Sequence, residues 1–446
     1  MVQTPKDTDG LAVPFGRLSR FARFGGMAAN VAGGMFFDGV QQLLSGKRPS
    51  LGDLLMTPAN ALKVTRQLAN MRGAAMKIGQ MISMDSSDFL PRELADILAQ
   101  LRADARHMPG SQLDRVLKAQ WGDGWQSRFA EFEYRPIAAA SIGQVHRAWT
   151  HDGAVLAIKV QYPGVRESID SDVNNAASLL LMTGLLPAKL DIKPLLEEGR
   201  RQLHQEADYA REAEHLGRFA TLLSGDENFE VPSFYPEFST DRILAMSYIE
   251  SEPIDAMMAA PQKTRDRIAT LLIELLLREL FVFGLMQTDP NFANYRFNTK
   301  TKRLVLLDFG ASRDISKKMA TSYRNMMRAI LSGSEEASFK AATDMGFIAA
   351  DMPAQYRSAI LEMLDMAMEP LQKDAPFDFG DNQIAQRLRE KGIELAAQRE
   401  LWHFPPADTL FIQRKFGGIY MLAGRLQARV NVRAMMQKYV GSVLSK

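Results

Sequence analysis

The chain has 446 residues, 46% of them hydrophobic, which is enough for two or three domains or for one two-lobed protein with an extension. Its formal net charge of +2 excludes a strongly basic overall character, so no nucleic-acid partner is expected. Because the chain contains no cysteine, disulfides, thiolate zinc sites and a cysteine nucleophile are excluded, and a reducing, cytoplasmic setting is expected.

The N-terminal segment, residues 1–50, carries no pattern of a secretory signal or a transit peptide. Its apolar stretch Phe24–Phe37 is only 14 residues long, whereas a spanning helix needs about 20 apolar residues, so no integral anchor is expected. Arg17, Arg20 and Arg23 precede this stretch, and basic residues beside a short apolar run are typical of a segment that lies on a membrane surface. A helical hairpin packed on the rest of the protein fits the same residues equally well.

Residues 51–125 predict a helical region, because Pro58 stands near a first-turn position and apolar residues follow at roughly helical spacing. Lys77 and Gln80 are three residues apart in this region, so on a helix they share a face and could project together into a cleft. An ordinary surface helix accounts for such a pair as well.

A β-rich region follows, and its clearest strand is Ala154–Val160, an apolar run that carries the single charged residue Lys159. A buried ammonium group must be paired, because its desolvation alone is costly. A lysine at a strand edge can instead extend its charged end to water.

A loop rich in small residues lies one hairpin before the lysine strand. It contains Ala138, Ala139, Ala140 and Ser141. Kinases place a glycine-rich phosphate-binding loop at this position. Alanine stiffens such a loop and limits positive φ, so we expect a nucleotide-covering loop whose geometry differs from that of ordinary protein kinases.

A partner for Lys159 is expected from the acidic segment Gln205–Glu214. In a regular helix Asp208 and Glu212 share a face, whereas Glu206 and Asp208 point apart, so these acids are expected to have different partners. A solvated helix face is the alternative interpretation of so many charges.

The most informative pattern is Asp289, followed five residues later by Asn294 and then by Asp308-Phe309-Gly310. Protein-kinase-like enzymes use this arrangement: the first aspartate orients the acceptor, while the asparagine and the second aspartate hold Mg²⁺. Carboxylates and an amide at hairpin spacing can also be ordinary turn residues. After Gly310 the chain enters helices without an Ala-Pro-Glu sequence, so the platform on which kinases dock peptides is missing.

Together these motifs resemble the UbiB family of atypical kinase-like proteins, which is associated with coenzyme Q (ubiquinone) biosynthesis. They are Lys77-x-Gly79-Gln80, the Ala138–Ser141 loop, Lys159, Glu206-x-Asp208 with Glu212, Asp289 with Asn294, and Asp308-Phe309-Gly310. Three segments resemble the branch that contains the mitochondrial coenzyme Q kinase-like proteins. They are the residues around Asp289, Phe404-Pro405-Pro406 and Arg414-Lys415-x-Gly417-Gly418.

The resemblance implies an α+β, two-lobed protein-kinase-like fold with a helical N-terminal extension packed over the active site. The extension would occupy 51–125, an N-lobe with a helical insertion 126–252, and a mostly helical C-lobe 253–446.

The resemblance also implies a role for each motif residue. Asp289 and Lys159 would be catalytic, and Asn294 and Asp308 would bind Mg²⁺. The nucleotide-binding residues would be Ala138, Ala139, Ala140, Ser141, Lys159, Glu212, Met246 and Tyr248, and the extension motif would pair Lys77 and Gln80 with Glu206 and Asp208.

The implied function is that of an ATP- and ADP-binding, Mg²⁺-dependent atypical kinase or ATPase that supports coenzyme Q biosynthesis and does not phosphorylate proteins in trans. Two alternatives stay open: a nucleotide-gated lipid- or protein-binding module without essential catalysis, and a small-molecule kinase. The implied partners are anionic membrane lipids, coenzyme Q precursors and coenzyme Q biosynthetic proteins, with a peripheral location at the inner membrane. Homodimer formation stays open.

Overall fold

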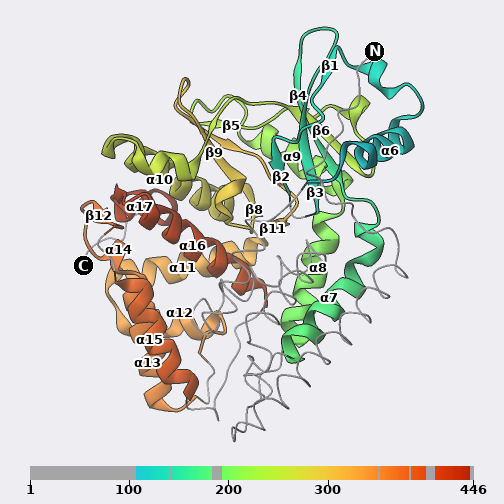
Figure 1. Ribbon diagram of the computed structural model, residues 1–446. Coiled ribbons are helices and arrows are strands. Elements are labelled where there is room, and N and C mark those ends of the chain that lie inside the picture. Colours follow the sequence, from blue (N-terminus) through green and yellow to red (C-terminus); the bar gives the residue numbers. More distant parts are fainter. Residues whose placement is uncertain are drawn as a thin grey trace, which may run out of the picture. The chain divides into compact units, whose positions relative to one another are not determined.

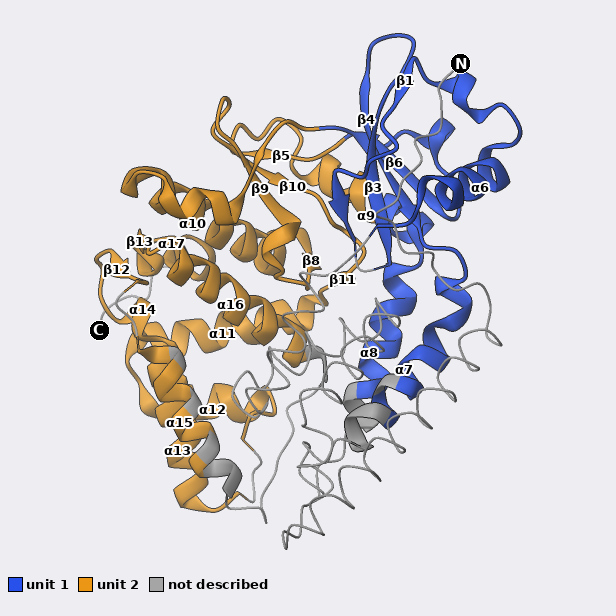
Figure 2. Cartoon of the chain, viewed as in Figure 1, with its two compact units in different colours: residues 1–214, 233–248 blue, residues 215–232, 249–446 orange. Residues whose placement is uncertain are grey.

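The structure, a computed structural model, describes residues 107–140, 142–182, 193–348, 352–380, 383–397 and 407–441. Helices and strands are mixed along the chain, which confirms the α+β class (Figure 1). The chain forms two compact units, which are coloured separately in Figure 2. Unit 1 comprises 1–214 and 233–248, and unit 2 comprises 215–232 and 249–446.

Unit 1 is built on one antiparallel sheet of five strands. Its strands are β1 (Glu131–Phe132), β2 (Ala138–Ala139), β3 (Gly143–Trp149), β4 (Val155–Gln161) and β6 (Ile243–Ser247). Strand β4 lies between β3 and β6, and this central place explains why its residues form a nearly continuous apolar run.

The helices of unit 1 are α6 (Gly110–Trp121), α7 (Val165–Met182), α8 (Lys193–Glu206) and the first part of α9 (Tyr209–Leu222). Helix α6 buries Leu113 and Leu117 in one apolar cluster with Leu156 and Ile158 of β4. The residues just before the expected border at 125/126 therefore share a core with the sheet. Helices α7 and α8 run side by side (Figure 1).

The acidic segment Gln205–Glu214 is divided between two helices and does not form one regular helix. Helix α8 ends at Glu206, and α9 begins at Tyr209. Asp208 lies between them, where its Oδ1 accepts a hydrogen bond from the backbone N–H of Arg211 at 3.1 Å. An aspartate that binds a backbone N–H in this way caps a new helix, and this explains the break.

Unit 2 contains a four-stranded sheet in the order β5 (Phe229–Glu230), β10 (Arg303–Leu306), β9 (Tyr295–Asn298) and β7 (Glu252–Pro253). Two smaller pairs join β8 (Leu285–Gln287) to β11 (Ser312–Asp314) and β12 (Phe377–Asp378) to β13 (Arg429–Val430). Because β5 pairs in parallel with β10, residues 215–232 belong to unit 2 although the flanking segments belong to unit 1.

Helices make up most of the rest of unit 2. They are α10 (Gln262–Arg278), α11 (Lys317–Ser332), α12 (Glu335–Asp344), α13 (Ala354–Ala367), α14 (Glu369–Gln372), α15 (Ile384–Ala397), α16 (Ala407–Arg425) and α17 (Val432–Val440). Helix α10 continues into a π-helical turn, η4 (Glu279–Phe283), which leads directly to β8. Within the described residues, no helix is long and apolar enough to cross a membrane.

Candidate functional site

Lys159 and Glu212 form a buried ion pair in unit 1. The Lys159 Nζ on β4 lies 2.8 Å from Oε1 and 3.0 Å from Oε2 of Glu212 on α9. The two side chains are only 10% and 1% exposed, so each charge needs the other. The ammonium also lies 5.3 Å from the ring centre of Tyr209. The lysine is thus held inside the fold rather than extended into water.

A second contact fixes the same helix to the strand. Gln161, two residues after Lys159 and on the same face of β4, donates from Nε2 to the carbonyl of Ala207 at 2.8 Å. Ala207 lies in the break between α8 and α9. The pair of contacts on β4 therefore sets both where α9 begins and how Glu212 is aimed.

The alanine loop forms a tight hairpin. Strand β2 pairs with β3, and Ala140 N–H donates to the carbonyl of Gly143 at 2.9 Å. A Cβ atom at Gly143 would lie within 3.0 Å of the carbonyl oxygen of Val160, so only glycine permits this approach of β3 to β4. Ala138 and Ala139 are exposed, and Ser141 lies outside the described residues. That the loop covers a nucleotide stays a prediction.

Met246 and Tyr248 lie at the end of β6. Met246 is buried and pairs with Ala157 of β4. Tyr248 N–H donates to the carbonyl of Val155 at 2.8 Å, and the Arg147 guanidinium lies 5.4 Å from the Tyr248 ring centre. The structure places both residues beside the lysine strand, and their contact with a nucleotide stays a prediction.

A buried polar chain beneath the loop was not found from the sequence. Gln144 accepts from Met108 N–H through Oε1 at 2.8 Å and donates to His146 Nε2 at 2.8 Å. The other ring nitrogen, Nδ1, donates to the carbonyl of Glu133 at 2.9 Å, and because Nε2 accepts from Gln144 the imidazole is neutral. Burial lowers the pKa of His146 from 6.5 to about 4. The available signal was that Gln144 and His146 are two residues apart in a strand and so point to one face of β3.

In unit 2, Asp289 and Asn294 belong to one compact turn that follows β8. The Asn294 side chain donates from Nδ2 to the backbone carbonyl of Asp289 at 2.9 Å, so its Oδ1 is the atom that can act as a ligand. Asn291 accepts from Ala293 N–H at 3.1 Å and caps the short 3-10 turn η5 (Phe292–Asn294). The local sequence thus fixes the turn through its own asparagines.

Backbone hydrogen bonds join this turn to the Asp308-Phe309-Gly310 segment. Leu307 N–H donates to the carbonyl of Asn294 at 3.1 Å, which brings the residue before Asp308 next to the asparagine. At the other end, Thr288 donates to the carbonyl of Ala311 from both its N–H, at 3.2 Å, and its hydroxyl, at 2.7 Å. The two sequence motifs are therefore neighbours in space.

Within the second motif, each residue has a defined place. Asp308 Oδ1 accepts from Gly310 N–H at 3.0 Å, which orients the carboxylate. Phe309 is buried, with its ring centre 5.2 Å from that of Phe219 in the unit 2 part of α9. The aspartate is thus anchored by its own turn and by the packing of the phenylalanine beside it.

The donor set of this segment fits Mg²⁺. An asparagine oxygen and a carboxylate are hard oxygen ligands, and Mg²⁺ commonly takes one or two such groups and fills its shell with waters and substrate phosphates. In the described part of the chain, no three or more histidine, aspartate or glutamate side chains gather as a self-sufficient metal site. Waters and the phosphate oxygens of a bound nucleotide would complete the shell of a metal held by Asn294 and Asp308.

The extension motif is only partly described. Glu206 is half-buried at the end of α8, and Asp208 caps α9. Lys77 and Gln80 lie outside the described residues, as do the segments 1–50 and Phe404-Pro405-Pro406. The proximity of these two halves of the motif stays a prediction.

Helix α16 adds contacts that the motifs did not suggest. Arg414 Nη2 lies 3.5 Å from Oδ1 of Asp289, and Lys415 is completely buried beside Gln287. The sequence had pointed to this segment only through its family resemblance. Its partners lie about 125 positions earlier, as the Arg414–Asp289 pair shows, so no local pattern reveals them.

A buried lysine–glutamate pair on an antiparallel sheet, with a second unit whose Asp-Phe-Gly segment is joined to an aspartate–asparagine turn, defines a kinase-like protein. Residues 100–342 match the ABC1 atypical kinase-like domain. The chain belongs to this family of atypical kinase-like proteins, which confirms the UbiB-type resemblance.

Two relatives show how far the similarity extends. The mitochondrial atypical kinase COQ8 of Saccharomyces cerevisiae is 36% identical over 436 residues, covering 97% of this chain and 87% of that protein. The mitochondrial atypical kinase COQ8B of Danio rerio is 37% identical over 427 residues, covering 95% and 68% respectively. The similarity therefore includes the segments on both sides of the kinase-like domain.

A solved structure also resembles this fold. Rv3197 of Mycobacterium tuberculosis, determined in complex with erythromycin, has a TM-score of 0.60 and 25% sequence identity. The match covers 85% of this chain and 95% of that one. With the family match, it confirms the kinase-like α+β fold.

Proposed function

We propose that this atypical kinase-like protein binds Mg·ATP and acts as an ATPase or phosphotransferase that supports coenzyme Q biosynthesis. The observation that carries the proposal is the buried Lys159–Glu212 pair. In kinase-like enzymes a strand lysine held by a helix glutamate contacts the nucleotide phosphates. The position of this pair supports the proposal, because Lys159 lies on β4, the strand that pairs with the alanine hairpin strand β3.

In this proposal the unit 2 residues perform the chemistry. Asn294 and Asp308 would hold the metal, which supplies charge to neutralise the phosphate oxygens. Asp289 would orient the acceptor hydroxyl or water and accept its proton as the acceptor oxygen bonds to the γ-phosphorus and the bond from that phosphorus to the bridging oxygen of the departing ADP breaks. The hydrogen bond from Asn294 to the Asp289 carbonyl supports this division, because it ties the metal ligand to the base by one backbone group.

Proteins are poor candidates for the acceptor. Only β11 and a short turn separate Gly310 from the start of α11 at Lys317. Ordinary protein kinases use a long segment at this place to dock peptides. The acceptor would therefore be water, a small molecule or a lipid.

A second candidate is a nucleotide-gated module whose turnover is incidental, and the alanine loop favours it. Three alanines at 138–140 limit the positive φ angles with which a glycine-rich loop curls over phosphates, so the hairpin suits nucleotide binding better than transfer. Both candidates need Lys159 and Glu212.

The Asp289→Asn variant discriminates between the two candidates. We expect the purified full chain to hydrolyse ATP with Mg²⁺, and the variant to bind nucleotide but lose turnover. The variant should be returned to a host strain that lacks its own relative and that the unaltered chain restores. Lost turnover with lost growth on respiratory substrate supports the enzyme, whereas lost turnover with normal growth supports the module. No nucleotide binding by the unaltered chain would refute both.

The link to coenzyme Q and to membranes comes from the family. The relatives named above are mitochondrial, and for this chain we propose peripheral membrane contact with anionic lipids, coenzyme Q precursors or coenzyme Q biosynthetic proteins. Flotation with anionic vesicles, with and without Mg·ATP, tests the lipid contact. Absence of binding in both conditions would remove the membrane part of the proposal.

A further inference from the structure

Helix α16 presents a row of residues to the segment that contains the proposed catalytic aspartate. The row consists of Phe411, Arg414, Lys415, Gly418 and Arg425, which recur at intervals of three, four and seven residues and so share one face. Four of the partners lie within Gln287–Phe292, and the fifth, Arg313, lies on β11, which pairs with β8. Two contacts are polar: Arg414 forms an ion pair with Asp289, and Lys415 donates a hydrogen bond to Gln287. Two are between a guanidinium and a ring: Arg313 lies over Phe411, and Arg425 lies over Phe292. The fifth is the close approach of Gly418 to Pro290.

Lys415 fixes the chain just before Asp289. Its buried Nζ donates to the carbonyl of Gln287 at 2.8 Å and to Tyr295 Oη at 2.8 Å, and it lies 3.1 Å from Glu279 Oε2. Glu279 Oε1 in turn accepts from Gln287 N–H at 3.2 Å, so both backbone groups of Gln287 are held by one ion pair. Burial lowers the pKa of Lys415, but attraction to Glu279 and Tyr295 outweighs it and raises the pKa, which keeps the ammonium charged.

Arg414 acts on the aspartate itself. Its Nη2 lies 3.5 Å from Asp289 Oδ1, and the two side chains are 9% and 14% exposed. A guanidinium at this distance and depth is screened little by water, so it favours one orientation of the carboxylate.

Gly418 sets the distance between α16 and the turn. A Cβ atom at this position would lie within 3.0 Å of both Cβ and Cγ of Pro290, the residue directly after Asp289. Carbon atoms in contact are normally about 3.5–4.0 Å apart, so any larger side chain must push the turn away by roughly 1 Å. The neighbouring Gly417 has no atom within 4 Å of its Cβ position.

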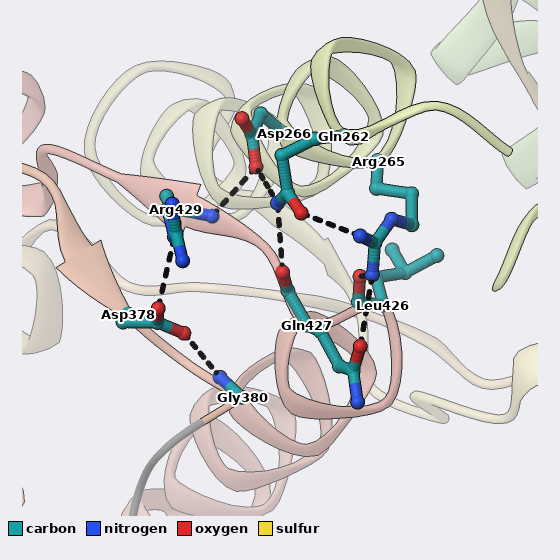
Figure 3. A network of polar contacts seen from close by, with 8 residues as sticks. All are labelled: Gln262, Arg265, Asp266, Asp378, Gly380, Leu426, Gln427 and Arg429. Atoms are coloured by element: carbon teal, nitrogen blue, oxygen red, sulfur yellow. Dashed lines mark hydrogen bonds and ion pairs between the residues drawn. The ribbon is translucent and has the colours of Figure 1, made fainter.

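The far end of α16 is fixed to α10, as Figure 3 shows. Arg265 donates to the carbonyl of Leu426 at 2.8 Å, and Gln262 donates to the carbonyl of Gln427 at 2.8 Å. Asp266 accepts from Arg429 N–H at 2.7 Å. The carbonyls at the end of the helix thus have side-chain partners, so α16 is anchored independently of the turn that it contacts.

From these contacts we propose that α16 is a positioning element for Asp289: Lys415 holds the preceding backbone, Arg414 orients the carboxylate, and Gly418 seats Pro290. The inference rests on the proposed function, because it gives these residues a role in turnover. It predicts a loss of turnover that is much larger than any loss of nucleotide binding, since the changes leave Lys159 in place and reach Asn294 only through its bond to the Asp289 carbonyl.

Gly418→Ala tests this proposal, with Gly417→Ala as its matched control. Both changes add one methyl group to the same helix and both favour helix formation to the same degree. We expect Gly418→Ala to lower kcat by about 100-fold, the order of loss that a misplacement of 1 Å produces. The Kd for Mg·ADP should stay within about threefold, and Gly417→Ala should keep kcat within about twofold.

Hydrogen–deuterium exchange of the peptide 285–295 gives a readout that does not depend on activity. Exchange in that peptide should rise in Gly418→Ala and not in Gly417→Ala. If the unaltered chain shows no turnover but exchange rises only in Gly418→Ala, the positioning role stands and the proposed function falls. If turnover is present and the two glycine variants match in kcat, the positioning role is refuted.

Arg414→Gln provides a second variant in case Gly418→Ala does not fold. It removes the charge beside Asp289 and leaves the Lys415 cluster in place. We expect kcat to fall at least about tenfold, with the Kd for Mg·ADP within about threefold. An unchanged kcat in folded Arg414→Gln would overturn the role assigned to Arg414.

Discussion

Acidification should destabilise unit 1 through His146, a residue with no place in the proposed chemistry. The imidazole is completely buried, stacks on Phe132 with ring centres 5.4 Å apart, and is neutral in its hydrogen-bonded chain. Protonation would give Nε2 a hydrogen that points at the donating amide of Gln144. If Gln144 turned over to accept it, the amide would face Met108 N–H instead, so the chain has no alternative arrangement.

The size of the effect follows from the pKa of His146, which burial lowers from 6.5 to about 4. Between these values the unfolded chain takes up a proton that the folded chain does not, so the free energy of unfolding falls as the pH falls. The contribution is fully present above pH 6.5 and is lost as the pH approaches 4. At pH 5.0 the unfolded histidine is ~97% protonated and the folded one ~10%, which corresponds to a loss of about 2 kcal/mol relative to pH 7.5.

Urea unfolding followed by tryptophan fluorescence measures this loss. Three of the four tryptophans, Trp121, Trp125 and Trp149, lie in unit 1, so the signal reports mainly on that unit. The unaltered chain and His146→Gln should be compared at pH 7.5 and 5.0. His146→Gln is expected to be less stable at pH 7.5 but to lose about 2 kcal/mol less on acidification. His151→Gln, at an exposed position, is the control.

Equal losses of stability on acidification in the unaltered chain and His146→Gln would refute the reasoning. That result would mean that other groups carry the whole pH dependence. The same conclusion would follow if His151→Gln reduced the pH dependence as much as His146→Gln did.

Three further changes test the rest of the site. Lys159→Met leaves Glu212 buried without its partner and should lower the free energy of unfolding in urea by about 3–5 kcal/mol. Adding Glu212→Gln should recover part of this loss. Equal stability of the single and double variants would contradict the pairing. Gly143→Ala places a Cβ within 3.0 Å of the Val160 carbonyl oxygen and should lower the free energy of unfolding by roughly 1–3 kcal/mol, and an unchanged value would show that β3 can move away at no cost. Asp308→Asn should abolish the Mg²⁺ dependence of ATP binding in calorimetry while leaving metal-free binding in place, and a retained Mg²⁺ effect would exclude Asp308 as a ligand.

The parts of the site that the sequence predicted are those built from neighbouring residues. Asp289, Asn294 and Asp308 lie within one hairpin of the chain, so spacing alone indicated their proximity. The strand that carries Lys159 was also predictable, because an apolar run of this length with one charge is typical of a buried strand. The choice among Glu206, Asp208 and Glu212 was harder, since it depends on where the helix breaks.

That break shows why helical periodicity alone does not describe the acidic segment. Periodicity assumes that the helix continues, and the sequence around 205–214 contains no glycine or proline to end it. The structure ends α8 at Glu206 because Ala207 and Asp208 have partners outside the helix: Gln161 binds one, and the other caps α9. A tertiary contact from β4 therefore overrides a local preference.

The contacts of α16 could not be predicted from the sequence either, because they too depend on residues far away in the chain. Lys415 is a charged residue in a helix, and without its partners it would be assigned to a solvated face. Its burial is stable only because Glu279, Tyr295 and the Gln287 carbonyl converge on it from three other elements, and no spacing in the sequence encodes such a convergence. Ion pairs of this kind contribute little net stability compared with apolar packing, so the geometry that this pair imposes explains its presence better than stability does. In this chain the ion pair fixes the backbone two residues before Asp289. A displacement of about 1 Å at this place would move the proposed catalytic carboxylate and lower the rate of turnover.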